Sequence, residues 1–234
     1  MTETPIADRD RLKREAAEAA VALIEDGMFV GLGTGSTAAF AIAALGRRVR
    51  DGLRVAAIPT SERLASQARE LGIPLTSFAE HQRLDLTIDG ADEVARDTLH
   101  LIKGHGGALL REKIVASASA RLVIIADGSK LVDRLGAASA VPIEVVPFGW
   151  QSTLRHLADL GGAVTPRLSG DGKLFVTDGG NVTLDLAFGP IADPPALECS
   201  IRAIAGVIDC GLFVGLASQV ILAEGTGILH LHRP

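Results

Sequence analysis

Short aliphatic runs alternate with amphipathic stretches through the first 130 residues of the chain. Apolar and alanine positions recur at helical spacing over 8–25, and the aliphatic run 28–32 that follows predicts a strand. The alternation continues, with strands expected at 54–58, 84–88, 100–103 and 122–126 and helices at 38–45, 62–71 and 108–120. Such alternation predicts right-handed crossovers between parallel strands. We therefore expect an α/β fold with an open, mostly parallel Rossmann-like sheet and helices on both faces.

The pattern changes near Pro142, where strand-like runs follow one another closely. Two gaps between them, 169–172 and 178–181, have the Gly, Asp and Asn content of hairpin turns. Strands are expected at 143–146, 163–168, 173–177, 182–186, 207–214 and 219–223, and helices at 151–160 and 196–204. A β-α-β-β-α-β run predicts a smaller, ferredoxin-like α+β domain. The expected division is a larger α/β domain over 1–137 and 215–234 and a small domain over 138–214.

The composition favours an aliphatic core and disfavours a binding surface for polyanions. Hydrophobic residues make up 47% of the chain but aromatic residues only 3%, with no Tyr, which suits strands buried between helices. The net charge is −5, and no stretch gathers Lys or Arg into a block. Binding to nucleic acid through a basic surface is therefore not expected.

The sequence shows no signal for secretion or for a membrane. Residues 1–20 lack the apolar segment of a signal peptide, and no apolar run reaches the roughly 18 residues that span a bilayer. Cys199 and Cys210 match no disulfide framework or metal-ligand spacing, and are expected to be small buried residues. His230 and His232 would share one face of a terminal strand, but a flexible tail is the simpler interpretation. We expect a cytoplasmic protein with no metal and no membrane partner.

Several polar motifs stand directly after predicted strands, where open α/β sheets bind their ligands. The first is Gly-Thr-Gly-Ser-Thr at 33–37, whose glycines and hydroxyls, with the N–H groups of the next helix, form a cradle for an anion. A plain strand-to-helix turn is the alternative. The dinucleotide fingerprint would need its third glycine one residue later and an acid near 54–61, and a P-loop would need a lysine. The phosphate is therefore expected to belong to a small sugar.

Asp89 and Asp92 follow the strand expected at 84–88. Two carboxylates that converge raise one another's pKa, which suits proton transfer near neutral pH. They could also bind Mg²⁺, or form an Asx turn and a helix cap. Spacing alone favours the turn, and the metal is the weakest alternative.

Two lysines also stand at strand ends. Lys103 precedes a flexible turn, 104–107, and could hold an oxyanion that develops on a substrate. A solvated lysine before a loop is an equal alternative. Lys130 could meet the phosphate. His105 lies in the turn, and a loop histidine is more often incidental.

Glu112 lies in the helix expected at 108–120. Its neighbours one turn away, Ala108, Val115 and Ala116, are apolar, and partial desolvation would raise the pKa of the carboxyl toward that of a useful base. Helical periodicity alone nevertheless favours an exposed glutamate that pairs with a nearby cation.

Taken together and in order, these motifs closely resemble the type A family of ribose-5-phosphate isomerases. The shared motifs are Gly-Thr-Gly-Ser-Thr-Ala at 33–38, Asp-Gly-Ala-Asp-Glu at 89–93, Lys-Gly at 103–104, Arg-Glu-Lys at 111–113, Ala-Asp-Gly-Ser-Lys at 126–130, Pro-Ile-Glu-Val at 142–145, Thr-Asp-Gly-Gly-Asn at 177–181 and Gly-Leu-Phe at 211–213. The resemblance implies interconversion of ribose 5-phosphate and ribulose 5-phosphate in the non-oxidative pentose phosphate pathway. It also implies that no cofactor takes part, and that the protein is a homodimer or a homotetramer.

The resemblance further implies roles for particular residues. Glu112 would be the base that moves a proton between C1 and C2, Asp89 with Asp92 would assist ring opening and proton movement, and Lys103 would stabilise the enediolate. Substrate and phosphate contacts would come from Thr34, Gly35, Ser36, Thr37, Gly90, Ala91, Gly104, His105, Gly106, Lys130 and Lys13.

One position departs from the family pattern. His105 stands where glycine is common in the turn after the lysine, although the spacing from Lys103 to Glu112 is kept. Two alternatives remain beside the isomerase. One is a non-catalytic sugar-phosphate sensor domain of the same fold, which would need no Lys103–Glu112 pair. The other is a related amino-sugar phosphate deaminase or acyl-CoA transferase.

Overall fold

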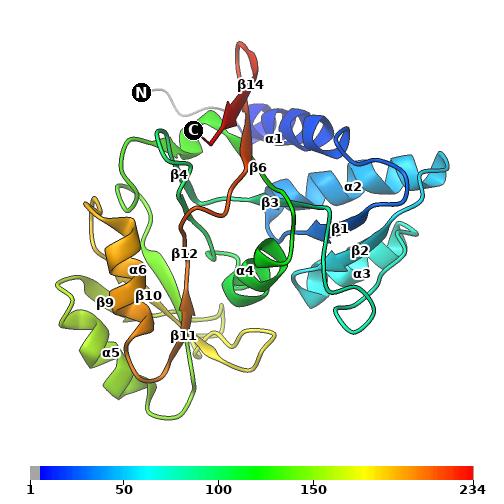
Figure 1. Ribbon diagram of the computed structural model, residues 1–234. Helices are drawn as coiled ribbons and strands as arrows, with labels where there is room; N and C mark the ends of the chain where they lie inside the picture. Colours follow the sequence, from blue (N-terminus) through cyan, green and yellow to red (C-terminus); the bar gives the residue numbers. More distant parts are fainter. Residues whose placement is uncertain (1–5, 234) are drawn as a thin grey trace. The chain divides into compact units, whose positions relative to one another are not determined.

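The computed structural model describes residues 6–233 (Figure 1). The chain divides into two compact units: the first holds the residues up to 91, 111–131 and those from 216 onward, and the second holds 92–110 and 132–215. The ranges expected from the sequence assigned 92–110 to the larger domain, and that division stays a prediction. Among the described residues, no helix is long and apolar enough to cross a membrane.

The first unit is built on a six-stranded sheet with the order β14-β13-β6-β3-β1-β2. Its strands are β1 (Phe29–Leu32), β2 (Ala56–Pro59), β3 (Leu86–Gly90), β6 (Leu122–Asp127), β13 (Gln219–Glu224) and β14 (Gly227–His232). Each neighbouring pair from β2 to β13 is parallel, and β14 runs antiparallel to β13. The expected open and mostly parallel sheet is confirmed.

Helices cover both faces of this sheet. They are α1 (Ile6–Val21), α2 (Ser36–Arg50), α3 (Glu62–Glu70) and α4 (Leu109–Ser117). Leu86 and Ile88 of β3 share a core with α1 and α2, so the intervening Thr87 points to the opposite face. There α4 approaches closely, because a Cβ on Gly31 would lie 2.0 Å from Thr87 Oγ1 and 2.5 Å from Val115 Cγ1.

The second unit contains a four-stranded sheet with the order β11-β8-β10-β9, and its neighbouring strands are antiparallel. Its elements in chain order are β8 (Val141–Val145), α5 (Trp150–Ala158), β9 (Ala163–Pro166), β10 (Val182–Ala187), α6 (Pro194–Arg202) and β11 (Val207–Cys210). Leu157 of α5 and Ile201 of α6 pack into the same core as the strands. This β-α-β-β-α-β order is the expected ferredoxin-like unit.

A third sheet has the order β12-β5-β4-β7. Its short strands are β4 (Glu93–Ala95), β5 (Leu101–Ile102), β7 (Leu131–Val132) and β12 (Leu212–Phe213), and a 3₁₀ turn, η1 (Gly128–Lys130), precedes β7. The single strand expected over 207–214 is two strands, β11 and β12, so that prediction was wrong. The break is at Gly211, where a Cβ would lie 2.0 Å from the carbonyl oxygen of Lys103.

Three other expectations were wrong. The helix expected to end at Gly46 continues to Arg50, and Gly46 serves close packing, because a Cβ there would lie 2.9 Å from Leu71 Cβ. Residues 173–177 form no regular strand and contribute isolated bridges. The expected flexible tail is β14, which pairs with β13 over six residue pairs.

Candidate active site

Three polar turns meet at one edge of the six-stranded sheet. Strands β6, β3 and β1 are parallel neighbours, so their carboxyl ends lie side by side. The turn 33–37 follows β1, Asp89 and Gly90 end β3, and the sequence Asp127–Lys130 ends β6 and forms η1. The register of the sheet therefore gathers residues that are almost 100 positions apart.

Asp89 lies directly against the turn after β1. Its side chain is 1% exposed, and a Cβ on Gly33 would lie only 1.9 Å from Asp89 Oδ1. The same oxygen accepts a hydrogen bond from the backbone N–H of Gly90 at 2.7 Å. Position 33 is therefore glycine because the Asp89 carboxylate occupies the space that a side chain would need. Spacing alone had favoured an Asx turn at Asp89, but its carboxylate also packs against the turn after β1.

Thr34 links this turn to the turn after β2. Its hydroxyl donates to Ser61 Oγ at 2.9 Å and lies 2.7 Å from Thr60 Oγ1. Because Thr34 has one hydroxyl hydrogen, Thr60 is the donor of the second bond. Since the Thr34 hydroxyl bonds Thr60 and Ser61, a phosphate contact from Thr34 would come from its backbone N–H.

The helix that begins after this turn offers an anion site. Gly35 caps α2 in a left-handed conformation, with φ of 121°, and it has no side chain to accept a bond from the first turn. Ser36 is exposed at the first helical position, and Lys13 Nζ of α1 lies 3.2 Å from its hydroxyl oxygen. The helix dipole, its amide N–H groups and one ammonium therefore favour a small anion here.

Glu112 is buried on the sheet-facing side of α4. It is 2% exposed and lies three residues before Val115, which packs on the sheet at Gly31. The exposed glutamate favoured by helical periodicity is therefore wrong. Its neighbour Arg111 takes the surface role instead and donates to Glu62 Oε1 of α3 at 2.9 Å. By strand alternation, Asp89 points to the same face of the sheet as α4.

Lys130 ends the third turn. The Asp127 carboxylate caps η1 by accepting a hydrogen bond from the backbone N–H of Ser129 at 3.0 Å. Lys130 is half-buried and lies three residues after Asp127. The cap fixes the backbone from which the lysine extends, and its expected phosphate contact stays a prediction.

In the second unit, Lys103 is buried rather than solvated. The residue is 2% exposed, and its Nζ lies 5.5 Å from the centroid of the Phe213 ring. Its backbone N–H donates to the carbonyl oxygen of Gly211 at 2.9 Å. A buried ammonium is costly unless a partner compensates it, and an aromatic face is one such partner. The interpretation as a solvated loop lysine is therefore wrong.

Asp92 and His105 hold each other within the second unit. The backbone N–H of His105 donates to Asp92 Oδ2 at 3.1 Å, and its ring Nδ1 lies 3.9 Å from Asp92 Oδ1. The ring Nε2 lies 3.1 Å from the carbonyl oxygen of Ala140. His105 is therefore not incidental, because it ties the turn after Lys103 both to Asp92 and to the segment before β8.

Sequence reasoning missed a role for Glu93. This carboxylate is buried and accepts three backbone N–H groups, from Gly136 at 2.6 Å and from Ala138 and Ser139 at 2.7 Å each. It thereby fixes the loop that leads to Ala140, the partner of His105. Its place in the shared motif at 89–93 was the available signal. Thr60 was also missed, although its position after a parallel strand could have indicated it.

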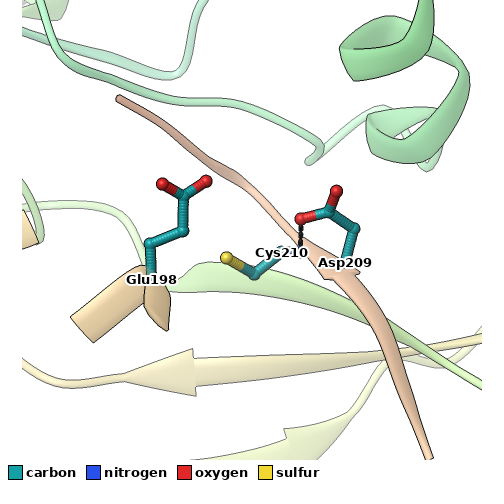
Figure 2. Close-up of side chains that lie close together, drawn as sticks. All are labelled: Glu198, Asp209 and Cys210. Carbon is teal, nitrogen blue, oxygen red and sulfur yellow. Dashed lines mark hydrogen bonds between the residues drawn. The ribbon is translucent and has the colours of Figure 1, made fainter. Parts of the chain in front are cut away.

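A second polar cluster lies elsewhere in the second unit. The side-chain atoms of Glu198, Asp209 and Cys210 that could bind a metal ion lie within 4.8 Å of one another (Figure 2). Asp209 Oδ1 accepts a bond from the backbone N–H of Cys210 at 2.8 Å and lies 3.9 Å from Arg202 Nε. Cys199 is exposed rather than buried as expected, whereas Cys210 is buried.

Comparison with known proteins settles the family. The family model of ribose 5-phosphate isomerase A (phosphoriboisomerase A) matches residues 56–227. A ribose-5-phosphate isomerase A from Gloeobacter violaceus is 61% identical over 221 residues, which span 94% of this chain and 96% of the relative. This chain belongs to the ribose 5-phosphate isomerase A family.

Solved structures of ribose 5-phosphate isomerase A agree with the fold. The enzyme from Methanocaldococcus jannaschii is 40% identical. The match covers 96% of this chain and 100% of that enzyme, with a TM-score of 0.93. A D-ribose-5-phosphate isomerase in complex with phospho-erythronic acid is 36% identical over 96% of this chain and 99% of that chain, also with a TM-score of 0.93. The resemblance and the fold class inferred from the sequence are therefore both confirmed.

Proposed function

We propose that this protein is an enzyme that interconverts ribose 5-phosphate and ribulose 5-phosphate through an enediolate. One observation carries the proposal: Glu112 is buried on the side of α4 that faces the sheet, although its sequence pattern favours exposure. A buried carboxylate is costly, so its position on the same face as buried Asp89 calls for a function. Family membership supplies the reaction.

Proton transfer is the chemistry that these residues supply. Once the sugar ring is open, the Glu112 carboxylate removes the proton from C2 of the aldose, and the electron pair forms the C1–C2 double bond of a cis-enediolate. Charge develops on O1, where the Lys103 ammonium stabilises it. Asp89, with Asp92, assists ring opening and the transfer of the hydroxyl proton from O2 to O1. Protonated Glu112 then returns its proton to C1, which leaves the ketone at C2.

The phosphate group is held by remote binding energy. The amide N–H groups at the start of α2 and the side chains of Ser36 and Thr37 contact it, with the cations Lys13 and Lys130 nearby. Gly90, Ala91, Gly104, His105 and Gly106 complete the substrate contacts, and His105 contributes through its backbone, as the glycine that is common at this position would. This grip lowers the barrier because it keeps C1 and C2 within reach of the base.

The remaining features of the protein follow from the same proposal. The reaction moves one carbon-bound proton and one hydroxyl proton, and it needs neither a metal nor an organic cofactor. Residues 1–137 and 215–234 form the catalytic domain, and 138–214 form the small domain. The protein acts in the cytoplasm as a homodimer or homotetramer and binds neither nucleic acid nor membranes.

The test is an isomerase assay in the presence of a metal chelator. Wild-type protein converts ribose 5-phosphate to ribulose 5-phosphate under these conditions, whereas Glu112→Gln loses about 100- to 10,000-fold in kcat. Phospho-erythronic acid, which a solved relative binds, should bind wild type and Glu112→Gln with similar affinity. Glu70→Gln, at the exposed end of α3, is the matched control. Full activity of Glu112→Gln would remove the base from the mechanism, and loss of wild-type activity in chelator would indicate a metal enzyme.

A further inference from the structure

The turn that follows Lys103 does not define its own conformation. Three of its four residues, at 104–107, are glycines, and Gly104 and Gly107 have φ angles of 108° and 78°. Glycine-rich segments sample many conformations, so holding one of them requires contacts from outside. The turn itself provides one hydrogen bond, from the N–H of Gly107 to the carbonyl oxygen of Gly104 at 3.0 Å.

His105 ties the turn to Asp92 and Ala140, and Arg167 adds contacts to two of its carbonyl oxygens from the same unit. Its Nη1 donates to the carbonyl oxygen of Gly104 at 2.8 Å and to that of His105 at 3.1 Å. Both carbonyls belong to the two residues directly after Lys103. Arg167 is separated from them by more than 60 positions, and no motif in the sequence connects them.

The guanidinium of Arg167 is itself firmly held. Its Nε donates to Asp185 Oδ2 at 2.9 Å, and its Nη2 donates to Asp185 Oδ1, which forms a bidentate pair. The two side chains are 15% and 23% exposed. The backbone is fixed as well, because Arg167 N donates to Thr183 O at 2.9 Å and Asp185 lies within β10. A planar fork with donors on two sides suits this geometry, and lysine could not reproduce it.

The same support reaches the far end of the turn. The Arg167 guanidinium lies 6.0 Å from the centroid of the Phe175 ring. That ring packs on Gly107, where a Cβ would lie 2.3 Å from Phe175 Cζ. Lys103 therefore has contacts at its backbone and its side chain, with Gly211 and Phe213 respectively. The turn that follows it is held by Arg167 and Phe175.

We propose that Arg167 is a positioning residue, which places the ammonium of Lys103 by fixing the turn after it. The inference rests on the proposed function, in which Lys103 stabilises the enediolate oxygen. Since that charge exists only along the reaction path, loosening the turn lowers kcat by more than it weakens substrate binding, to which residues of the turn also contribute. A displacement of about 1 Å can cost about 100-fold in rate.

The first measurement is the kinetics of Arg167→Gln on ribose 5-phosphate. We expect kcat to fall about 10- to 100-fold, with KM within about threefold of wild type. Arg167→Lys should not recover the rate, because its ammonium cannot bond both Asp185 and the carbonyls. Arg155→Gln, at an exposed position of α5, is the matched control and should retain wild-type kinetics. A KM increase with unchanged kcat would overturn the inference.

A double-mutant cycle with Lys103→Met separates positioning from a general structural role. If Arg167 acts through Lys103, then Arg167→Gln costs less than about threefold once Lys103 is methionine. A full additional 10- to 100-fold loss in that background would overturn the inference. If Lys103→Met alone leaves kcat unchanged, the assigned role of Lys103 fails instead. Should Arg167→Gln not fold, the cycle is run with Asp185→Ala, which keeps the guanidinium but removes both oxygens that anchor it, and the same outcomes decide.

Discussion

Replacement of Gly33 by alanine tests how the Asp89 carboxylate is placed. The new Cβ would lie 1.9 Å from Asp89 Oδ1 and 2.0 Å from its Cγ, whereas ordinary contact begins at 3.4 Å. The carboxylate must therefore move by about 1.5 Å, and a shift of about 1 Å can cost about 100-fold in rate. Overpacking of this kind also costs about 1–3 kcal/mol of unfolding free energy. We expect Gly33→Ala to fold, with kcat/KM at least about 100-fold below wild type.

The assay combines initial rates of ketose formation from ribose 5-phosphate with urea unfolding of the same samples. Gly225→Ala is the matched control, since a Cβ there meets no atom within 4 Å. The double variant Gly33→Ala/Asp89→Ala removes the group that the new methyl meets, and should recover part of the lost unfolding free energy. Wild-type activity in folded Gly33→Ala would show instead that Asp89 acts equally well from a displaced position, and that its placement by Gly33 is not needed.

Three further predictions follow from the described contacts. Thr34→Val leaves the buried Thr60 donor without its acceptor and should lower the urea unfolding free energy by about 1–3 kcal/mol; Thr34→Ser should restore most of it. His105→Gly keeps the backbone N–H that binds Asp92 but loses the ring contact to Ala140. We therefore expect kcat/KM to stay within about threefold of wild type while the unfolding free energy falls by about 0.5–1.5 kcal/mol. A tenfold loss of rate would contradict this expectation. The Arg54 guanidinium holds the pKa of Asp26 below its usual value of 3.8. This pair therefore stabilises the fold above about pH 4, and its contribution is lost as the pH falls further. When the unfolding free energy is measured against pH in the acid range, Asp26→Asn should show a shallower decline than wild type.

Much of the fold could be predicted because local patterns and global packing agree. The aliphatic runs of β1, β3 and β6 each end in a turn of Gly, Asp or Ser, and parallel pairing places those turns at one edge. Gly46 was misjudged because a glycine ends many helices, and its role in packing against Leu71 has no local signal. The strand β14 was missed for a similar reason, since its pairing with β13 decides its conformation.

The site was less predictable than the fold, because burial depends on neighbours that are distant in the sequence. Helical periodicity favoured an exposed Glu112, and a solvated Lys103 was an equal alternative, but the structure buries both. The chain places Gly31 and Val115 so that α4 lies close to the sheet, and it places Phe213 beside Lys103. Arg167 could not be found from the sequence at all, since its partners are backbone carbonyls that follow Lys103.

In the proposed reaction, Glu112 carries the proton between C1 and C2. Proton exchange in ²H₂O, followed by NMR of ribose 5-phosphate and ribulose 5-phosphate, tests it most directly. We expect wild-type protein to exchange the transferred hydrogen with solvent, and folded Glu112→Gln to do so about 100- to 10,000-fold more slowly, while Glu70→Gln matches wild type. Exchange at the wild-type rate in Glu112→Gln would contradict the account, because another group would then be the base.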